Sequence, residues 1–228
     1  MVGSATPLVS GGVAVPGAGG IGLGIGIILG LFGLVLAIGI LGAVIILVVA
    51  NRADPDPSSR RPQSVYFFAV SFLTVLISIV SSVVIVEALT SLMTPHRAPI
   101  ANSVARTAVV SALLLITDLI LARSHLRRGV ELARAGEEPT TPARRVGQSY
   151  AALMAFLMVL VLIVTIVVSV YLIFGLVGPG VFGSFGGRSA AGRDLIVSAY
   201  TAIVALSVLR AHLHLVPPRL RIFGHTTS

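Results

Sequence analysis

The sequence predicts an all-α integral membrane protein with five transmembrane helices: one glycine-rich N-terminal helix and a four-helix bundle made of two hairpins in parallel repeat. Three observations predict this class. Hydrophobic residues make up 56% of the chain and charged residues 11%, whereas about a quarter of residues are charged in soluble domains. The mean hydropathy is +1.03. Apolar runs reach the ~20 residues that cross a bilayer and alternate with short polar segments.

The N-terminal region contains two segments of different character. Residues 1–20 are uncharged and rich in Gly, Ser, Pro and Val, so we expect a disordered outer tail that is not cleaved as a signal peptide. Residues 21–50 are an uninterrupted apolar run, predicted as a tilted transmembrane helix. Within it, Gly22, Gly26 and Gly30 have the four-residue spacing that allows close helix approach. They predict helix–helix association, although glycine is also common in membrane helices generally.

Four further apolar spans follow the glycine-rich run. They lie at residues 65–93, between Arg106 and Arg123, at residues 150–177, and between Arg193 and Arg210. The span that ends at Arg123 is expected to continue as a helix into the charged segment and stop at Gly136. Thr141 followed by Pro142 is typical of an N-cap and a first helical residue, so a new helix is predicted to begin there.

An internal repeat relates the last four spans to one another. Arg60-Arg61 with Tyr66 and Phe72 recurs at a constant offset as Arg144-Arg145 with Tyr150 and Phe156. The spacing from Arg106 through Arg123 to His125 also equals that from Arg193 through Arg210 to His212. These spacings predict a duplicated two-helix hairpin, at residues 60–128 and 144–215, followed by a basic tail at residues 216–228.

This pattern resembles an uncharacterised bacterial membrane-protein family, a domain of unknown function whose members carry a duplicated transmembrane hairpin that starts with basic residues and then Tyr. The resemblance covers about residues 60–215 and leaves the glycine-rich helix outside. It implies the duplicated-hairpin fold and carries no activity over to this chain.

The distribution of arginines predicts the orientation. Twelve of the sixteen arginines lie in segments 51–64 and 123–148 and in the tail that begins at Arg210, and the chain has no lysine. The positive-inside rule then places the N-terminus outside and the C-terminus in the cytoplasm of a multi-pass protein of the bacterial plasma membrane. The expected inner-interface anchors are Arg60, Arg61, Tyr66, Arg144, Arg145 and Tyr150. Because the arginines flank apolar spans, the expected partners are the lipid bilayer and its anionic headgroups rather than nucleic acid.

Two acids lie well inside spans, where ionisable residues are functional candidates. Glu87 lies near the predicted level of Arg106, and Asp118 lies within two turns of Arg123. We expect each acid to form a structural ion pair with its neighbouring arginine. The alternative is a proton or cation path that uses Glu87 and Asp118.

No metal, cofactor or catalytic residue is expected. The chain has no cysteine, which excludes disulfides and thiolate ligands. His125 and His212 occupy equivalent repeat positions and could face each other as haem or metal ligands, but both lie just beyond the inner arginines and are expected to anchor at the interface. Serines such as Ser78, Ser81 and Ser82 are interpreted as interhelical hydrogen-bond donors, because no His or Lys lies at membrane depth to activate them.

These features favour a non-catalytic membrane subunit or scaffold. It is expected to form homo-oligomers, or to dock on other membrane protein subunits, through the glycine-rich first helix. Two other functions remain open: a small transporter or channel that uses Glu87 and Asp118, and an intramembrane enzyme or haem carrier.

Overall fold

The computed structural model describes residues 60–92, 101–135, 142–178 and 187–213, together with positions 33, 37, 40, 41 and 44. Four long helices occupy the continuous ranges: α2 (Arg60–Ser91), α3 (Ala101–Arg134), α4 (Pro142–Val177) and α6 (Gly187–Leu213). All four are long and apolar enough to cross a membrane. Gly22, Gly26 and Gly30 lie outside the described residues, and so does most of the predicted glycine-rich helix at residues 21–50.

The helix boundaries follow local sequence signals. The helix α4 begins at Pro142 as predicted, because the fixed φ of proline suits the first helical position and its missing N–H has no intrahelical partner there. The helix α3 continues past Arg123 to Arg134, as expected for a helical extension of the span. At the start of α6, Gly187 has a φ of 79°, in the left-handed region that favours glycine.

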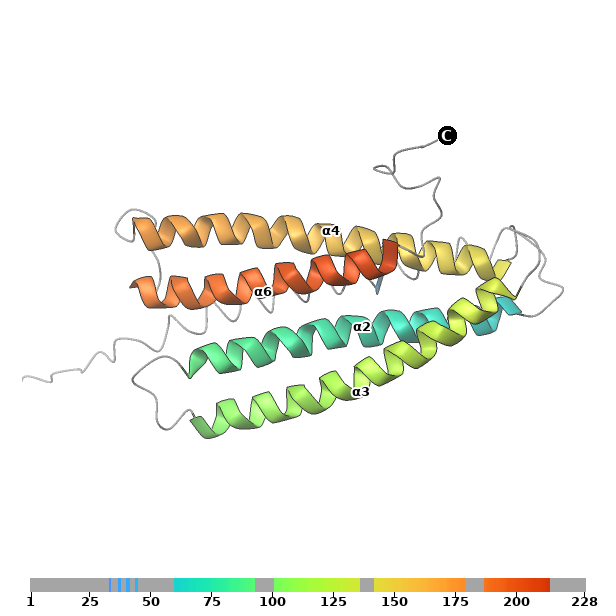
Figure 1. The fold of residues 1–228 in the computed structure, drawn as a ribbon, viewed down its shortest axis with the longest axis horizontal. Coiled ribbons are helices and arrows are strands. Elements are labelled where there is room, and N and C mark those ends of the chain that lie inside the picture. The colour runs from blue at the N-terminus through green and yellow to red at the C-terminus, as the bar shows by residue number, and fades with distance from the viewer. Residues whose placement is uncertain are drawn as a thin grey trace, which may run out of the picture.

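The helices form two antiparallel hairpins that lie side by side (Figure 1). In the first hairpin α3 packs along α2, and in the second α6 packs along α4. Figure 1 shows that α2 and α4 start at the same end of the bundle and run in the same direction. Between the hairpins, α2 contacts both α4 and α6, and α3 contacts α4. The helices α2, α3 and α4 share one end of the bundle, where α2 and α4 start and α3 ends. The helix α6 stops short of this shared end (Figure 1).

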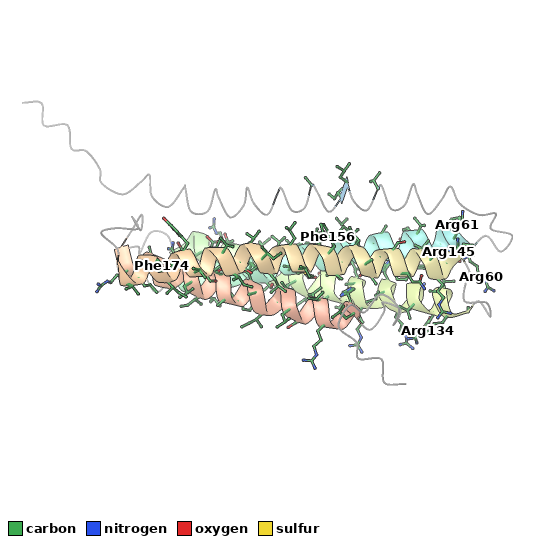
Figure 2. All side chains as sticks on the ribbon, turned by 90° about the horizontal axis from the view of Figure 1, so that it is seen from above. Arg60, Arg61, Arg134, Arg145, Phe156 and Phe174 are labelled. Carbon is green, nitrogen blue, oxygen red and sulfur yellow. The ribbon has the colours of Figure 1, made fainter. Side chains whose placement is uncertain are left out.

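Arginines gather at that shared end. Figure 2 shows Arg60, Arg61, Arg134 and Arg145 together there, while Phe174 lies at the opposite end. At 1.5 Å per residue the 34 residues of α3 extend about 51 Å, which exceeds the ~30 Å hydrocarbon core of a bilayer. A helix of this length can therefore carry Arg134, its last residue, beyond the hydrocarbon.

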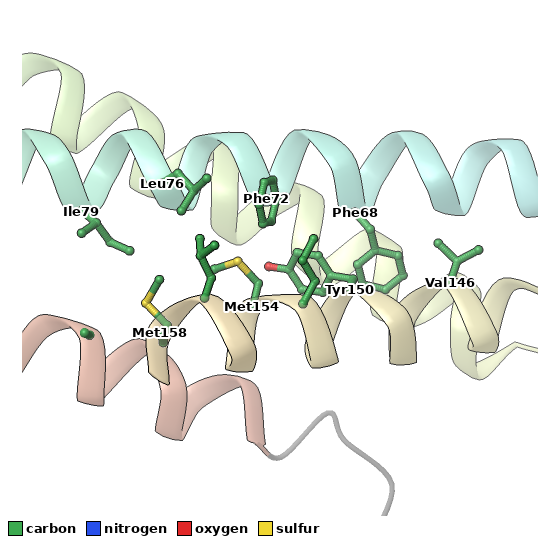
Figure 3. Packing of buried hydrophobic residues seen from close by; sticks show 11 residues of the cluster. Phe68, Phe72, Leu76, Ile79, Val146, Tyr150, Met154 and Met158 are labelled. Carbon is green, nitrogen blue, oxygen red and sulfur yellow. The ribbon is translucent and has the colours of Figure 1, made fainter. Parts of the chain in front are cut away.

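The core lies mainly between α2 and α4 (Figure 3). Met154 and Leu157 on α4 have no exposed surface, and Phe72 and Leu76 on α2 face that helix. In a bilayer the surrounding lipid is as apolar as these side chains, so close packing rather than removal from water stabilises the contact. The buried cluster consists of Phe68, Phe72, Leu76, Ile79, Val146, Tyr150, Leu153, Met154, Leu157, Met158 and Ala205.

Phe68 joins three helices at the arginine-rich end. Its ring tip lies against Gly129 of α3, where an added Cβ would be 3.2 Å from Phe68 Cζ. It also lies against Gly147 of α4, where an added Cβ would be 3.0 Å from the same atom. The two glycines therefore provide the space that this buried ring occupies.

Candidate functional site

The arginine-rich end is built from the starts of α2 and α4 and the end of α3 (Figure 2). Arg60 Nη1 donates a 3.2 Å hydrogen bond to the carbonyl of Ala135, just after the last residue of α3. The last carbonyls of a helix have no intrahelical donor, so this bond caps α3. Arg61 is buried, with 7% of its surface exposed. The predicted anchor Arg60 thus fastens α2 to the end of α3. The side chains of Arg144 and Arg145 are exposed.

A tyrosine and a histidine join the two helices of the second hairpin. The Tyr150 hydroxyl lies 2.9 Å from His212 Nε2, and His212 Nδ1 lies 2.8 Å from the Val208 carbonyl oxygen. A carbonyl oxygen only accepts, so Nδ1 carries the proton and Nε2 accepts from the hydroxyl. Both side chains are buried, each with 5% of its surface exposed. The contact locks α4 to α6 at the point where α6 ends.

The first hairpin contains the equivalent residues, Tyr66 and His125, as an open pair: no hydrogen bond joins the two side chains in the described structure. The ring centroids of Tyr66 and His125 are 6.0 Å apart, compared with 5.5 Å for Tyr150 and His212. Tyr66 is nevertheless 57% exposed, and the described part of the chain shows no hydrogen bond from its hydroxyl to His125. The two tyrosines, predicted as equivalent interface anchors, therefore have different environments. The internal repeat puts the tyrosines and the histidines at equivalent positions, and this is the feature of the sequence from which both Tyr–His pairs could have been predicted.

Glu87 and Asp118 do not pair with the predicted arginines in the part of the chain that the structure describes. Glu87 is partly buried, and the charges that act on it are those of Arg193 and Asp194 on α6. The start of α6 therefore supplies its cationic neighbour, while the Arg106 side chain is exposed on α3.

Asp118 is buried between helices, with 7% of its surface exposed, and its Oδ2 has no hydrogen-bond partner among the described residues. Arg123 follows it by five residues. At 100° per residue, this separation puts the two side chains about 140° apart around α3, so they do not share a face. Arg123 is exposed, and the predicted Asp118–Arg123 pair does not form in the described structure.

Two of the predicted serines, Ser78 and Ser82, do not bond to a second helix in the described structure. Ser78 donates to the Thr74 carbonyl and Ser82 to the Ile79 carbonyl, both within α2. This local bonding satisfies the hydroxyl without a second helix. Other serines make the interhelical bonds: Ser64 of α2 donates to the Ala143 carbonyl at 3.2 Å, and Ser198 donates to the Thr165 carbonyl at 3.1 Å. Ser198 Oγ also lies 2.9 Å from Ser169 Oγ.

Each histidine packs against the tyrosine of its own hairpin, so the geometry does not favour a haem or metal held between His125 and His212. Within the described ranges, no group of three or more His, Asp or Glu residues lies close enough to hold a metal ion. Comparison of the chain with family models, with curated proteins and with solved structures finds no match. Function is therefore inferred from the arrangement of the described residues.

Proposed function

We propose that this protein is a non-catalytic subunit or scaffold of the bacterial plasma membrane that assembles with copies of itself or with other membrane proteins. In this proposal the chain has five transmembrane helices. The second hairpin repeats the first in parallel, and the helix at residues 21–50 makes the assembly contact through Gly22, Gly26 and Gly30.

The packed interface between the hairpins is the observation that carries this proposal. Transporters built from repeats bind their substrates near the bilayer midplane, at the interface between the repeats. Here that interface is filled by hydrocarbon, with Leu76 and Ile79 of α2 facing α4 (Figure 3). On α4, Leu157 and Met158 have 0% and 1% of their surface exposed. A water-lined path would have to displace these side chains, whereas a scaffold needs a rigid interior.

The outward faces supply apolar surface for lipid and for neighbouring subunits. Along α3 and α4, large side chains point away from the bundle core and are about half exposed or more. They are Val109, Val110, Leu113, Leu114, Ile116, Leu119 and Ile120 on α3, and Phe156, Ile163, Ile166, Val167 and Val170 on α4. Neighbouring membrane helices pack against such faces where small residues allow close approach, which is the role proposed for the glycine-rich helix.

The proposed orientation puts the arginine-rich end in the cytoplasm, with the N-terminus outside and the C-terminus inside. What supports it is the excess of arginines in the segments that flank the shared start of α2 and α4.

A cation or proton transporter is the second candidate, and Asp118 is the observation that favours it. A buried carboxylate is costly unless it is paired, and its Oδ2 has no partner among the described residues. His125 contacts Phe67, and Asp118 lies seven residues before His125, so the antiparallel register puts Asp118 near the level of Thr74. Ser71, one turn away, is also buried with an unpaired hydroxyl in the described part.

The assembly state tests the scaffold proposal. Gly26→Leu should lower the mass of the purified assembly measured by light scattering, because it inserts a side chain where helix backbones are predicted to meet. Gly42→Leu is the matched control: it lies sixteen residues later, about 160° around the same helix, and should leave the mass unchanged. Equal masses for wild type and Gly26→Leu would count against the proposed contact.

Reconstitution distinguishes the two candidates. Protein in proteoliposomes should carry no proton or cation flux above that of empty vesicles. If wild-type protein does carry a flux that Asp118→Asn abolishes while the thermal unfolding transition survives, the transporter proposal replaces the scaffold.

A further inference from the structure

The open pair Tyr66–His125 has two hydrogen-bonding groups that do not bond to each other, unlike those of the equivalent pair Tyr150–His212. In the second hairpin, Tyr150 donates to His212 Nε2 and both groups are satisfied. In the first hairpin, the interplanar angle is similar, 60° against 57°, but the rings lie further apart. The Tyr66 hydroxyl and His125 Nε2 make no hydrogen bond within the described residues.

The hydrogen bonds around His125 define what its free nitrogen can do. His125 Nδ1 lies 2.9 Å from the Leu121 carbonyl oxygen, so Nδ1 carries the proton. The neighbouring Ser124 hydroxyl donates to the same carbonyl at 3.0 Å and is not needed as a donor to the ring. Nε2 of the neutral ring is therefore an acceptor, while the Tyr66 hydroxyl can donate. A ligand that fits both groups carries a hydroxyl and a separate acceptor oxygen.

The surroundings of this pair combine aromatic and cationic groups. Phe67 packs against both rings, with centroid distances of 5.3 Å to Tyr66 and 5.7 Å to His125. Arg128 lies one turn beyond His125 along α3 and is exposed. An exposed guanidinium next to two open hydrogen-bonding groups complements an anionic headgroup.

On the other side of the pair, toward the middle of the helices, the surface is hydrocarbon. Leu73 lies seven residues after Tyr66, on the same face of α2, and is 46% exposed. On α3, Leu121 and Leu114 precede His125 on its face and are 39% and 47% exposed. The aromatic pair therefore lies between arginine and exposed hydrocarbon, as interfacial aromatic residues do in membrane proteins.

We propose that Tyr66, His125 and Arg128 bind one anionic phospholipid whose headgroup carries a free hydroxyl, with phosphatidylglycerol as the probe. The Tyr66 hydroxyl donates to a phosphate oxygen, Arg128 pairs with the phosphate, and the headgroup hydroxyl donates to His125 Nε2. The acyl chains lie along Leu73 and Leu114. The closed pair Tyr150–His212 binds no lipid, because its two groups already satisfy each other. This site does not depend on whether the protein is a scaffold or a transporter.

Native mass spectrometry of the full chain in neutral detergent tests the site. Titration with phosphatidylglycerol should give one tight binding event, and phosphatidylethanol, equally anionic but without a headgroup hydroxyl, should bind several-fold more weakly. Glycerol phosphate, which has the headgroup chemistry without acyl chains, should not displace the lipid. Equal binding of the two lipids, or displacement by glycerol phosphate, would overturn the proposed recognition.

Matched variants locate the site. Tyr66→Phe and His125→Gln should each weaken phosphatidylglycerol binding by about fivefold, the loss expected for one hydrogen bond, and Arg128→Gln by at least as much. Arg127→Gln removes the same charge from a side chain that is 81% exposed and paired with Glu131, and should leave binding unchanged. Thermal unfolding of each variant establishes that it is folded. If Tyr66→Phe binds as wild type does, or if Arg127→Gln loses as much as Arg128→Gln, the site is wrong.

Discussion

The ring of Phe68 occupies the space that a side chain on Gly147 would need, since a Cβ there would lie 3.0 Å from Phe68 Cζ. Gly129 restricts the same ring tip from α3. Phe68 is buried, with 3% of its surface exposed. One aromatic ring thus sets how closely α2, α3 and α4 approach.

Gly147→Ala should therefore destabilise the protein, by about 1–3 kcal/mol, as overpacking of a full core does. Gly192→Ala is the control: among the described residues its Cβ would meet only Leu176 Cδ2 at 3.9 Å, so the change should be neutral or stabilising by up to about 1 kcal/mol through helix propensity. Thermal unfolding in detergent, followed by circular dichroism, measures both. A Gly147→Ala protein as stable as the Gly192→Ala protein would show that Phe68 moves aside freely.

The two tyrosines of the repeat should differ in their effect on stability. Tyr150→Phe leaves buried His212 Nε2 without its donor and should cost about 1–2 kcal/mol. Tyr66→Phe removes a hydroxyl that makes no hydrogen bond in the described structure and should change stability in lipid-free detergent by less than about 0.5 kcal/mol. Unfolding transitions of the two variants, measured side by side, check this difference. Equal losses would mean that the open pair is closed in solution.

Glu87 should couple energetically to Arg193 rather than to Arg106. In a double-mutant cycle, Glu87→Gln with Arg193→Gln should show an interaction free energy of about 0.3–1 kcal/mol, because the carboxyl is only partly buried. The cycle of Glu87→Gln with Arg106→Gln should show none, since the Arg106 side chain is exposed and is not among the charges that act on Glu87 in the described structure. A larger coupling to Arg106 would restore the pairing predicted from the sequence.

The orientation can be measured without background because the chain contains no cysteine. Single cysteines are placed at Thr141, which precedes α4 in the sequence, and at Ser189, in the first turn of α6. The helix α4 starts at the arginine-rich end of the bundle and α6 starts at the other end. An impermeant thiol reagent should label Ser189→Cys in intact cells and should label Thr141→Cys after permeabilisation only. The opposite pattern would reverse the proposed topology.

Features that depend on nearby residues in the chain could be predicted from the sequence. The all-helical class, the start of α4 at Pro142 and the extension of α3 to Arg134 follow from apolar length and local capping chemistry. Helix geometry alone also separates Asp118 from Arg123, because five residues turn the helix well past one face. The proximity of Glu87 to Arg193 and the burial of Tyr150 depend on how one hairpin lies against the other, and local spacing holds no information about that placement.

Because each hairpin is packed more extensively within itself than against the other, the order in which the chain leaves the ribosome has a consequence for membrane insertion. The helices α2 and α3 can pair while α4 is still being synthesised, and Gly129 then reaches Phe68 before Gly147 exists. Until α4 arrives, one flank of the Phe68 ring faces lipid or the translocation machinery. Docking of the second hairpin covers that flank. A change in the environment of the Phe68 ring should therefore mark the step at which the two hairpins, inserted separately, pack into one bundle.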